Sequence, residues 1–249
     1  MKILEKSNEK VSFVEEMDES LANAIRRSSL EIPILAIDEV EFSKNDSVLY
    51  DEVLALRLGL VPLKTEKDLE LKEECSCKGK GCSKCSVQLK LSAKGPGVVY
   101  SKELKGKADV VFEDIPIDSL AEGQELEFSA TAIVGKGITH TKFSPGLVYY
   151  RNSAELEIEK LENAEACAEA CPKNVLKAEK GKLTLIDKYK CDLCEACVEE
   201  CKKHNGVIKI VPGKEIVFVI ESYGQIPAKD ILEGAVHALK NNLKKVIKA

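Results

Sequence analysis

Six of the ten cysteines of this chain lie between residues 167 and 201, and their spacing restricts the fold more than any other feature. The downstream four follow the pattern C-x2-C-x2-C-x3-C, and the upstream two follow C-x3-C-P. One short loop can surround three corners of a cubic metal cluster, so the fourth ligand has to come from elsewhere in the chain. We therefore expect the two segments to fold against each other around a cluster. The cysteines are Cys167, Cys171, Cys191, Cys194, Cys197 and Cys201.

This spacing resembles that of bacterial ferredoxins, where three cysteines of one run and the last cysteine of another run hold one 4Fe–4S cluster. A complete upstream run would need cysteines at two positions where the chain has Leu161 and Ala164, and neither side chain can bind iron. The ligand exchange of ferredoxins therefore leaves one complete site and one half site. We expect one 4Fe–4S cluster, with a 3Fe–4S form as its oxidised product. The expected ligands are Cys171, Cys191, Cys194 and Cys197.

Cys167 and Cys201 are the two cysteines of this stretch that the complete site does not use. We expect them to lie near each other, because both would line the same half site. Two alternatives are open for them, either free thiols or a disulfide, and a short separation makes the disulfide sterically feasible.

A second group of four cysteines lies between residues 75 and 85, in the pattern C-x-C-x4-C-x2-C. Two close pairs across a small loop suit one tetrahedral zinc ion, which accepts four thiolates without a geometric preference of its own. Lysines within the loop would offset the negative charge of a zinc–thiolate site. The alternative is a set of reduced cysteines in an irregular loop. The expected zinc ligands are Cys75, Cys77, Cys82 and Cys85.

Charge and composition exclude several classes of protein. The net charge of −5 and the isoelectric point near 5.5 argue against a protein that coats nucleic acid by itself. No apolar run approaches the roughly 18 residues of a membrane span, and the charged N-terminus is unlike a signal peptide. We therefore expect a cytoplasmic protein without membrane contact, in a compartment where cysteines favour metal binding over disulfides.

Hydrophobic periodicity predicts a mixed fold with more strands than helices. A first helix is expected from Asp18 or Ser20 up to Pro33, with Leu21 and Ile25 in the core. A second helix is expected near residues 50–58, and a turn over residues 118–123. Strands are expected over residues 2–5, 10–15, 34–42, 87–92, 98–100, 109–112, 126–134, 148–150 and 215–221.

A third helix, from Asp230 onward, carries an apolar stripe on one face and lysines on the other. A stripe of this length on a terminal helix faces either the core or a dimer partner. The stripe consists of Leu232, Ala235, Val236, Leu239, Leu243 and Val246.

Several stretches resemble the α-subunit-like family of multisubunit RNA polymerases, and within it the archaeal D-type subunits. The likeness spans nearly the whole chain. The combination of an α-type scaffold with a ferredoxin-like insert is specific to the D type. The stretches that carry the resemblance are residues 23–27, 31–33, 36–40, 51–63, 140–145 and 221–227.

The resemblance implies an α+β fold with a dimerisation domain split between residues 1–44 and 214–249. A β-rich domain would be inserted over residues 45–155 and would contain the zinc-type loop 75–85. A ferredoxin-like 4Fe–4S domain would follow over residues 156–213. The zinc position of eukaryotic counterparts coincides with the second cysteine group.

The resemblance also implies a non-catalytic assembly subunit of a nucleotidyltransferase complex. It would pair with the small L subunit, be joined by the N and P subunits, and form the platform for the large catalytic subunits. No stretch resembles the aspartate triad of a polymerase, so we expect neither a catalytic residue nor sequence-specific nucleic-acid binding on this chain. The cluster would stabilise the insert. The alternative is a ferredoxin-like electron-transfer protein, which the cysteine spacing alone favours.

Overall fold

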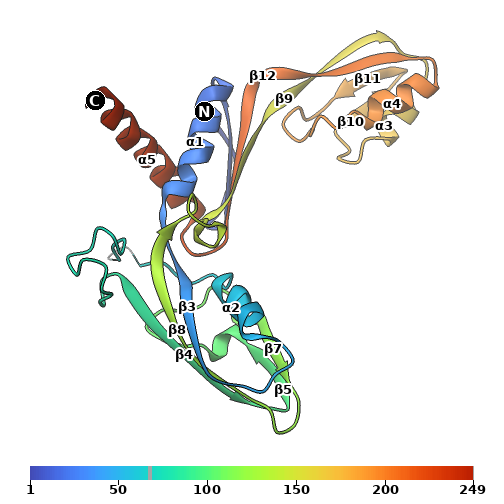
Figure 1. Cartoon of the computed structure of the whole chain (residues 1–249). Helices are drawn as coiled ribbons and strands as arrows, with labels where there is room; N and C mark the ends of the chain where they lie inside the picture. Colours follow the sequence, from blue (N-terminus) through green and yellow to red (C-terminus); the bar gives the residue numbers. More distant parts are fainter. Residues whose placement is uncertain (67–68, 249) are drawn as a thin grey trace. The chain divides into compact units, whose positions relative to one another are not determined.

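The computed structural model describes residues 1–66 and 69–248, and the mixed α and β fold that the sequence predicts is confirmed (Figure 1). The chain forms two compact units, each assembled from separate stretches. Unit 1 comprises Met1–Lys6, Ser12–Asn23 and Tyr149–Val219. Unit 2 comprises Ser7–Val11, Ala24–Val148 and Ile220–Ala249.

Unit 1 is built on a four-stranded sheet in the order β1-β2-β12-β9. The ring of Phe218 stacks on Phe13 with centroids 5.4 Å apart and on Tyr150 at 6.4 Å, so aromatic side chains from three strands pack together. Such ring pairs stabilise a sheet beyond their buried area. The strands are β1 (Lys2–Lys6), β2 (Lys10–Glu16), β9 (Gly146–Lys160) and β12 (Val207–Ser222).

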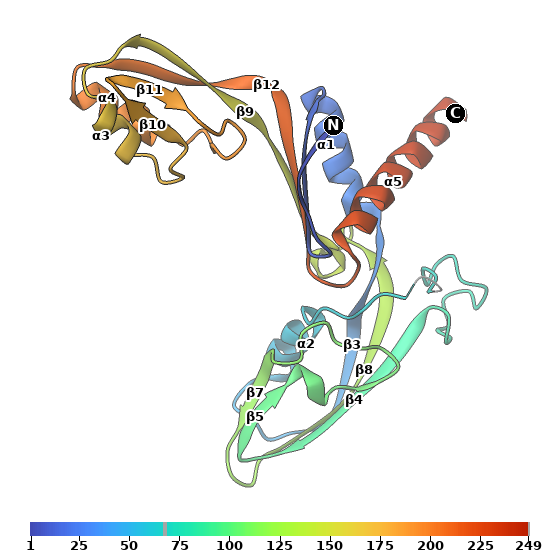
Figure 2. The same cartoon turned by 180° about the vertical axis from the view of Figure 1, so that it is seen from behind.

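Strands β9 and β12 are much longer than the sequence predicts, and they continue as a two-stranded ribbon to the cysteine-rich module (Figure 2). Within the module, the side chain of Asn163 accepts a hydrogen bond from the Ala166 amide and starts a short helix. Five of the thirteen buried residues of the module core are cysteines. Its elements are α3 (Ala164–Glu169), β10 (Leu176–Glu179), β11 (Lys182–Leu185) and α4 (Ala196–Lys203).

Unit 2 contains an antiparallel sheet in the order β3-β8-β4-β6 and a two-stranded sheet of β5 and β7. Val87, Leu89 and Leu91 of β4 are buried, and the polar residues between them are not, which is the alternation expected of a strand with one face on a core. Leu54 and Leu58 of helix α2 belong to the same core. The elements are β3 (Pro33–Asn45), α2 (Asp51–Gly59), β4 (Ser86–Lys94), β5 (Gly97–Tyr100), β6 (Lys105–Gly106), β7 (Pro116–Leu120) and β8 (Glu125–Lys136).

Helix α5 (Ala228–Lys248) ends the chain and packs its first half in unit 2. The Asn242 amide donates a hydrogen bond to Glu31 at 2.7 Å, and Gly234 lets the side chain of Ile32 approach closely. Within the described residues, no helix combines the length and the hydropathy that crossing a membrane requires. The short helical turns are η1 (Ser29–Glu31), η2 (Ser101–Glu103) and η3 (Thr141–Phe143), and α1 (Glu19–Ser28) has residues in both units.

One strand prediction was wrong, and one turn was expected too early. Residues 109–112 form a single bridge, between Leu63 and Val110, rather than a strand. The turn expected over residues 118–123 is confined to its second half, at residues 121–124, because β7 continues to Leu120 and pairs with β5. The reason is burial, because Ile117 and Leu120 of β7 enter the core of unit 2, whereas Val110 lies at its edge.

One prediction about an apolar helix face also needs correction. Leu21 was expected in the core, but 47% of its surface is exposed, and Ile25 is only half-buried. The stripe on α5 was expected to face the core or a dimer partner. It is buried near Ala235, while Leu243 and Val246 are exposed by 54% and 74%. Helical spacing identifies residues that share a face, but it does not identify what covers that face.

Gly135 of β8 offers a test of this packing. An added Cβ would lie 2.6 Å from the ring of Phe143, which is buried in unit 2. We expect Gly135→Ala to lower the free energy of unfolding by about 1–3 kcal/mol, the usual cost of overpacking. Urea unfolding followed by circular dichroism measures it. Gly59→Ala is the control, because its Cβ would meet only ordinary contacts, and equal losses in both variants would contradict the explanation.

Candidate metal centres

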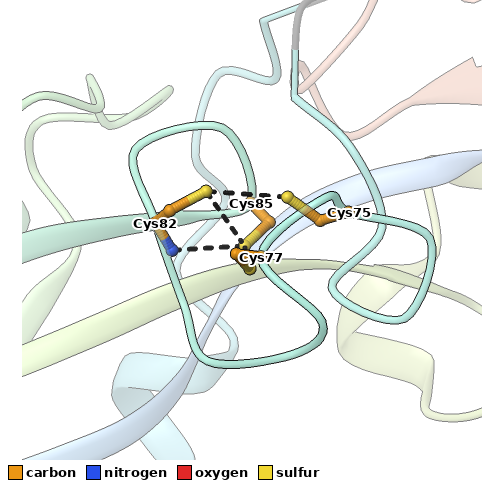
Figure 3. Close-up of side chains that lie close together, drawn as sticks. All are labelled: Cys75, Cys77, Cys82 and Cys85. Carbon is orange, nitrogen blue, oxygen red and sulfur yellow. Dashed lines mark hydrogen bonds between the residues drawn. The ribbon is translucent and has the colours of Figure 1, made fainter.

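The four cysteines of the second group converge in the loop before β4, with all four sulfur atoms within 4.8 Å of one another (Figure 3). The sulfur atoms of Cys75 and Cys82 are 3.6 Å apart, and so are those of Cys77 and Cys85. The loop reverses sharply at Lys78, Gly79 and Gly81, all three with positive φ. The chain therefore folds locally to bring four sulfur donors to one point.

The thiols of this group compete for ionisation. The amide of Cys77 favours the thiolate of Cys75, but burial and the neighbouring thiols outweigh it and raise the pKa of Cys75 to about 12. Burial opposes ionisation of Cys77, yet hydrogen bonds from the Cys85 and Cys75 thiols lower its pKa to about 7. Burial also raises the pKa of Cys85. One thiolate forms readily and further ones repel it, so the full donor set needs a cation at its centre.

These four side chains could hold one metal ion, and the geometry suits it. A single tetrahedral ion is bound by four ligand atoms that lie close together. The four sulfur atoms, all within 4.8 Å of one another, have this arrangement. The backbone closes the loop around the group, since the Glu70 amide donates to the Lys84 carbonyl at 2.8 Å. The lysines of the loop, at positions 78, 80 and 84, are all exposed.

The expected iron–sulfur ligands lie in the module of unit 1, where all four line one small cavity. Cys171 lies two residues after the end of α3, and Cys197 lies in the first turn of α4. Leu193 and Glu195 have φ near +60°, so the intervening loop curls back on itself and presents its cysteines inward. Three of the four are buried, and Cys194 is exposed.

The sulfur atoms around this cavity influence one another electrostatically. Burial, reinforced by the charges of Cys171 and Cys191, raises the pKa of Cys197 to about 11. Burial also raises the pKa of Cys191 against the hydrogen bond from the Leu193 amide, and the charges of Cys171 and Cys194 add to the rise. The charges of neighbouring expected ligands therefore oppose ionisation of Cys191 and Cys197.

Cys167 and Cys201 are completely buried, and neither of them lines that cavity. Burial and a hydrogen bond with Cys201 raise the pKa of Cys167 to about 12. A Cβ at Gly206 would lie 2.4 Å from the sulfur of Cys201, so a glycine is required there. Four of the six cysteines thus line the cavity and two do not, although the charge of Cys197 also acts on Cys167.

Arg151 is a residue of this site that sequence reasoning missed. It lies on β9, forty residues before the ligand run, and its guanidinium donates to the carbonyl of Cys191 at 2.7 Å and to the carbonyl of Tyr189. It is half-buried, and it holds the backbone of Cys191, one of the residues that line the cavity. No pattern near position 151 could have found it, because the contact depends on β9 running alongside the module.

We expect Arg151→Met to destabilise the loop that carries Cys191, because two carbonyls lose a charged donor, which costs about 1–3 kcal/mol. Arg151→Lys keeps the charge and one donor, so its effect should be smaller. Limited proteolysis of residues 187–197, followed by mass spectrometry, measures the opening of this loop. Equal cleavage rates for the wild type and Arg151→Met would contradict the role.

Comparisons with known proteins identify one matching domain family and relatives that align with nearly the whole chain. Residues 37–146 match the family model described as the RNA polymerase Rpb3/RpoA insert domain. The chain is 36% identical to DNA-directed RNA polymerase subunit Rpo3 of Methanosarcina acetivorans, over 98% of this chain and 96% of the relative. It is 37% identical to subunit Rpo3 of Pyrococcus horikoshii, over 99% of this chain and 96% of the relative.

These relatives correct the type that the sequence resemblance suggested. The resemblance pointed to the D type, whereas the relatives are named Rpo3, including that of Thermococcus kodakarensis at 37% identity over 96% of this chain and 92% of the relative. The match of residues 37–146 to the Rpb3/RpoA insert domain agrees with this correction. The chain belongs to the archaeal Rpo3 family of DNA-directed RNA polymerase subunits.

Proposed function

We propose that this chain is a non-catalytic assembly subunit of archaeal RNA polymerase that works in the cytoplasm. The observation that carries the proposal is the match to subunits named Rpo3 over 98% of the chain. In this proposal it forms a heterodimer with the L subunit, is joined by the N and P subunits, and receives the large catalytic subunits. Residues 1–44 and 214–249 supply the dimerisation domain, and residues 45–155 supply the insert.

The far half of α5 supports a dimer surface. Leu243, Val246 and Ile247 are exposed by 54%, 74% and 84%, and they follow one another at helical spacing. Apolar side chains gathered in this way on a soluble helix are typical of a surface that a partner covers. Lysines flank this surface and would face an acidic rim on the partner.

For the cysteine loop 75–85, zinc is the proposed ion. A closed set of four thiolates in a small loop is typical of structural zinc sites. The ion would fix a loop that contributes few apolar side chains to the core of unit 2, so binding and folding of the loop would be coupled.

For the module over residues 156–213, one 4Fe–4S cluster is proposed, with Cys171, Cys191, Cys194 and Cys197 as ligands and a 3Fe–4S form on oxidation. A four-iron cluster occupies the space between its ligands, and a cavity lined by all four cysteines supports it. When bound, the cluster would supply folding free energy to a core in which five of the thirteen buried residues are cysteines. Ferredoxin-like electron transfer is the alternative. The cysteine spacing alone favours it, whereas the match to subunits named Rpo3 over 98% of the chain supports the scaffold.

We expect Val246→Glu to weaken the heterodimer with the L subunit by at least about tenfold, because a charge would be buried at the partner's surface. Purified chains mixed at known concentrations and measured by analytical ultracentrifugation give the affinity. Ile186→Glu is the matched control, since Ile186 is exposed by 61% and lies in the cysteine-rich module. Equal affinities for both variants would exclude α5 as the dimer surface.

Metal analysis of anaerobically prepared protein should separate the two centres. Cys82→Ser should lose zinc and keep iron, while Cys194→Ser should lose iron and keep zinc, because each substitution removes one sulfur donor from one centre. Among the module cysteines, Cys171→Ser should lose iron and Cys201→Ser should retain it. The opposite result for this last pair would show that the ligand assignment is wrong.

A further inference from the structure

Helix α2 in unit 2 has an apolar face that the described part of the chain does not cover. Tyr50, Val53, Leu56 and Leu60 recur at three- and four-residue spacing, and Leu56 and Leu60 are exposed by 60% and 58%. The opposite face, with Leu54 and Leu58, is completely buried. The helix is therefore apolar on both sides, and only one of them serves the core of this chain.

Two adjoining hollows lie at the C-terminal end of this face, and they share Leu60 and Ile115 in their lining. We name the two together the α2 groove. Phe112 and Tyr223 form its rim on one side and are exposed by 51% and 46%. Arg57 lies on the other side. The groove is thus a continuous apolar depression bordered by aromatic rings, the usual form of a protein-binding surface.

One buried polar atom in the lining of the groove has no hydrogen-bond partner. Gln225 lines the groove and is 94% buried, yet its side-chain oxygen accepts no hydrogen bond. Its own backbone is held in place, because the Thr65 amide donates to the Gln225 carbonyl at 3.1 Å. A buried acceptor without a donor costs free energy. An occupant that offers an N–H group would remove that cost.

The charges around the groove are all positive among the described lining residues. The Arg57 guanidinium donates to the Pro116 carbonyl at 2.6 Å and forms no ion pair within the described chain. Lys142 is already paired, since its ammonium lies 2.6 Å from the Asp38 carboxylate. No described carboxylate lines either hollow. Charge complementarity therefore favours an occupant with a carboxylate that reaches Arg57.

We propose that the α2 groove binds an apolar segment of another polymerase subunit, and that this segment carries a carboxylate for Arg57 and an N–H donor for Gln225. The proposal rests on the assembly function above. A second copy of this chain is a poorer occupant, because a symmetric contact through this face would bring the cationic grooves of two copies together.

The test uses the full tagged chain, co-expressed with the other polymerase subunits of its organism. Phe112→p-benzoylphenylalanine places a photoreactive ring on the rim, and the crosslinked peptide is identified by mass spectrometry. Leu60→Glu and Arg57→Glu should lower the amount of retained polymerase subunits at least about tenfold, the effect of about 1.4 kcal/mol. Arg57→Lys and Val48→Glu should stay within about twofold. Val48 is the matched control, as an apolar residue of unit 2 exposed by 83%.

A crosslink from position 112 to an apolar, acid-bearing peptide of another subunit, together with these losses, supports the proposal. A crosslink to this chain itself, a partner peptide without a carboxylate, or full retention by Arg57→Glu would overturn it. Thermal unfolding checks the fold of each variant. If Leu60→Glu does not fold, the retention of polymerase subunits by Arg57→Glu alone decides the test. If the wild-type chain and all variants retain the polymerase subunits equally, the groove proposal is wrong and the assembly function stands. If the wild-type chain retains none, the assembly function fails and the groove proposal falls with it.

Discussion

The pairing of β9 with β12 is the contact on which unit 1 depends. These strands are about fifty residues apart in sequence, so their pairing closes a long loop, and that closure has an entropic cost that only favourable contacts can offset. The contacts come from the stacked rings of Phe13, Phe218 and Tyr150 at one end. At the other end they come from the module itself. The ribbon thus carries the cysteine-rich module and aligns Arg151 with the ligand loop at the same time.

Thiol chemistry explains why the cysteines lie in two centres of different shape. In the loop before β4, four sulfur atoms are gathered to within 4.8 Å, a distance suited to one ion. In the module, four cysteines line a cavity, while Cys167 and Cys201 are hydrogen-bonded to each other. In both places burial raises the pKa of several thiols, so the thiolate form needs a positive charge beside it. Metal binding at either centre would therefore be coupled to folding and to proton release.

The chain also leaves more apolar surface exposed than its own core needs. The end of α5 and the outer face of α2 each present side chains exposed by more than half, among them Ile247 and Leu56. Both belong to unit 2, which otherwise has a well-filled core around the β3-β8-β4 sheet. Exposed apolar faces next to a complete core indicate a protein whose stable state includes partners. An assembly subunit requires surfaces of this kind.

The sequence by itself determined the two cysteine groups, the two strands at the N-terminus and the existence of three helices, because each depends on local spacing or periodicity. It predicted strands at β3, β4 and β8 by alternation, but it placed a turn where β7 runs and a strand where one bridge forms. Those segments are decided by burial against distant parts of the chain. Leu21 shows the same limit, since its helical position was correct and its environment was not. Only the tertiary structure decided the role of Arg151 and the existence of the α2 groove, where Gln225 has its unpartnered oxygen. Both depend on residues that are far apart in sequence, from about thirty-eight positions for Arg151 to about one hundred and seventy for the groove.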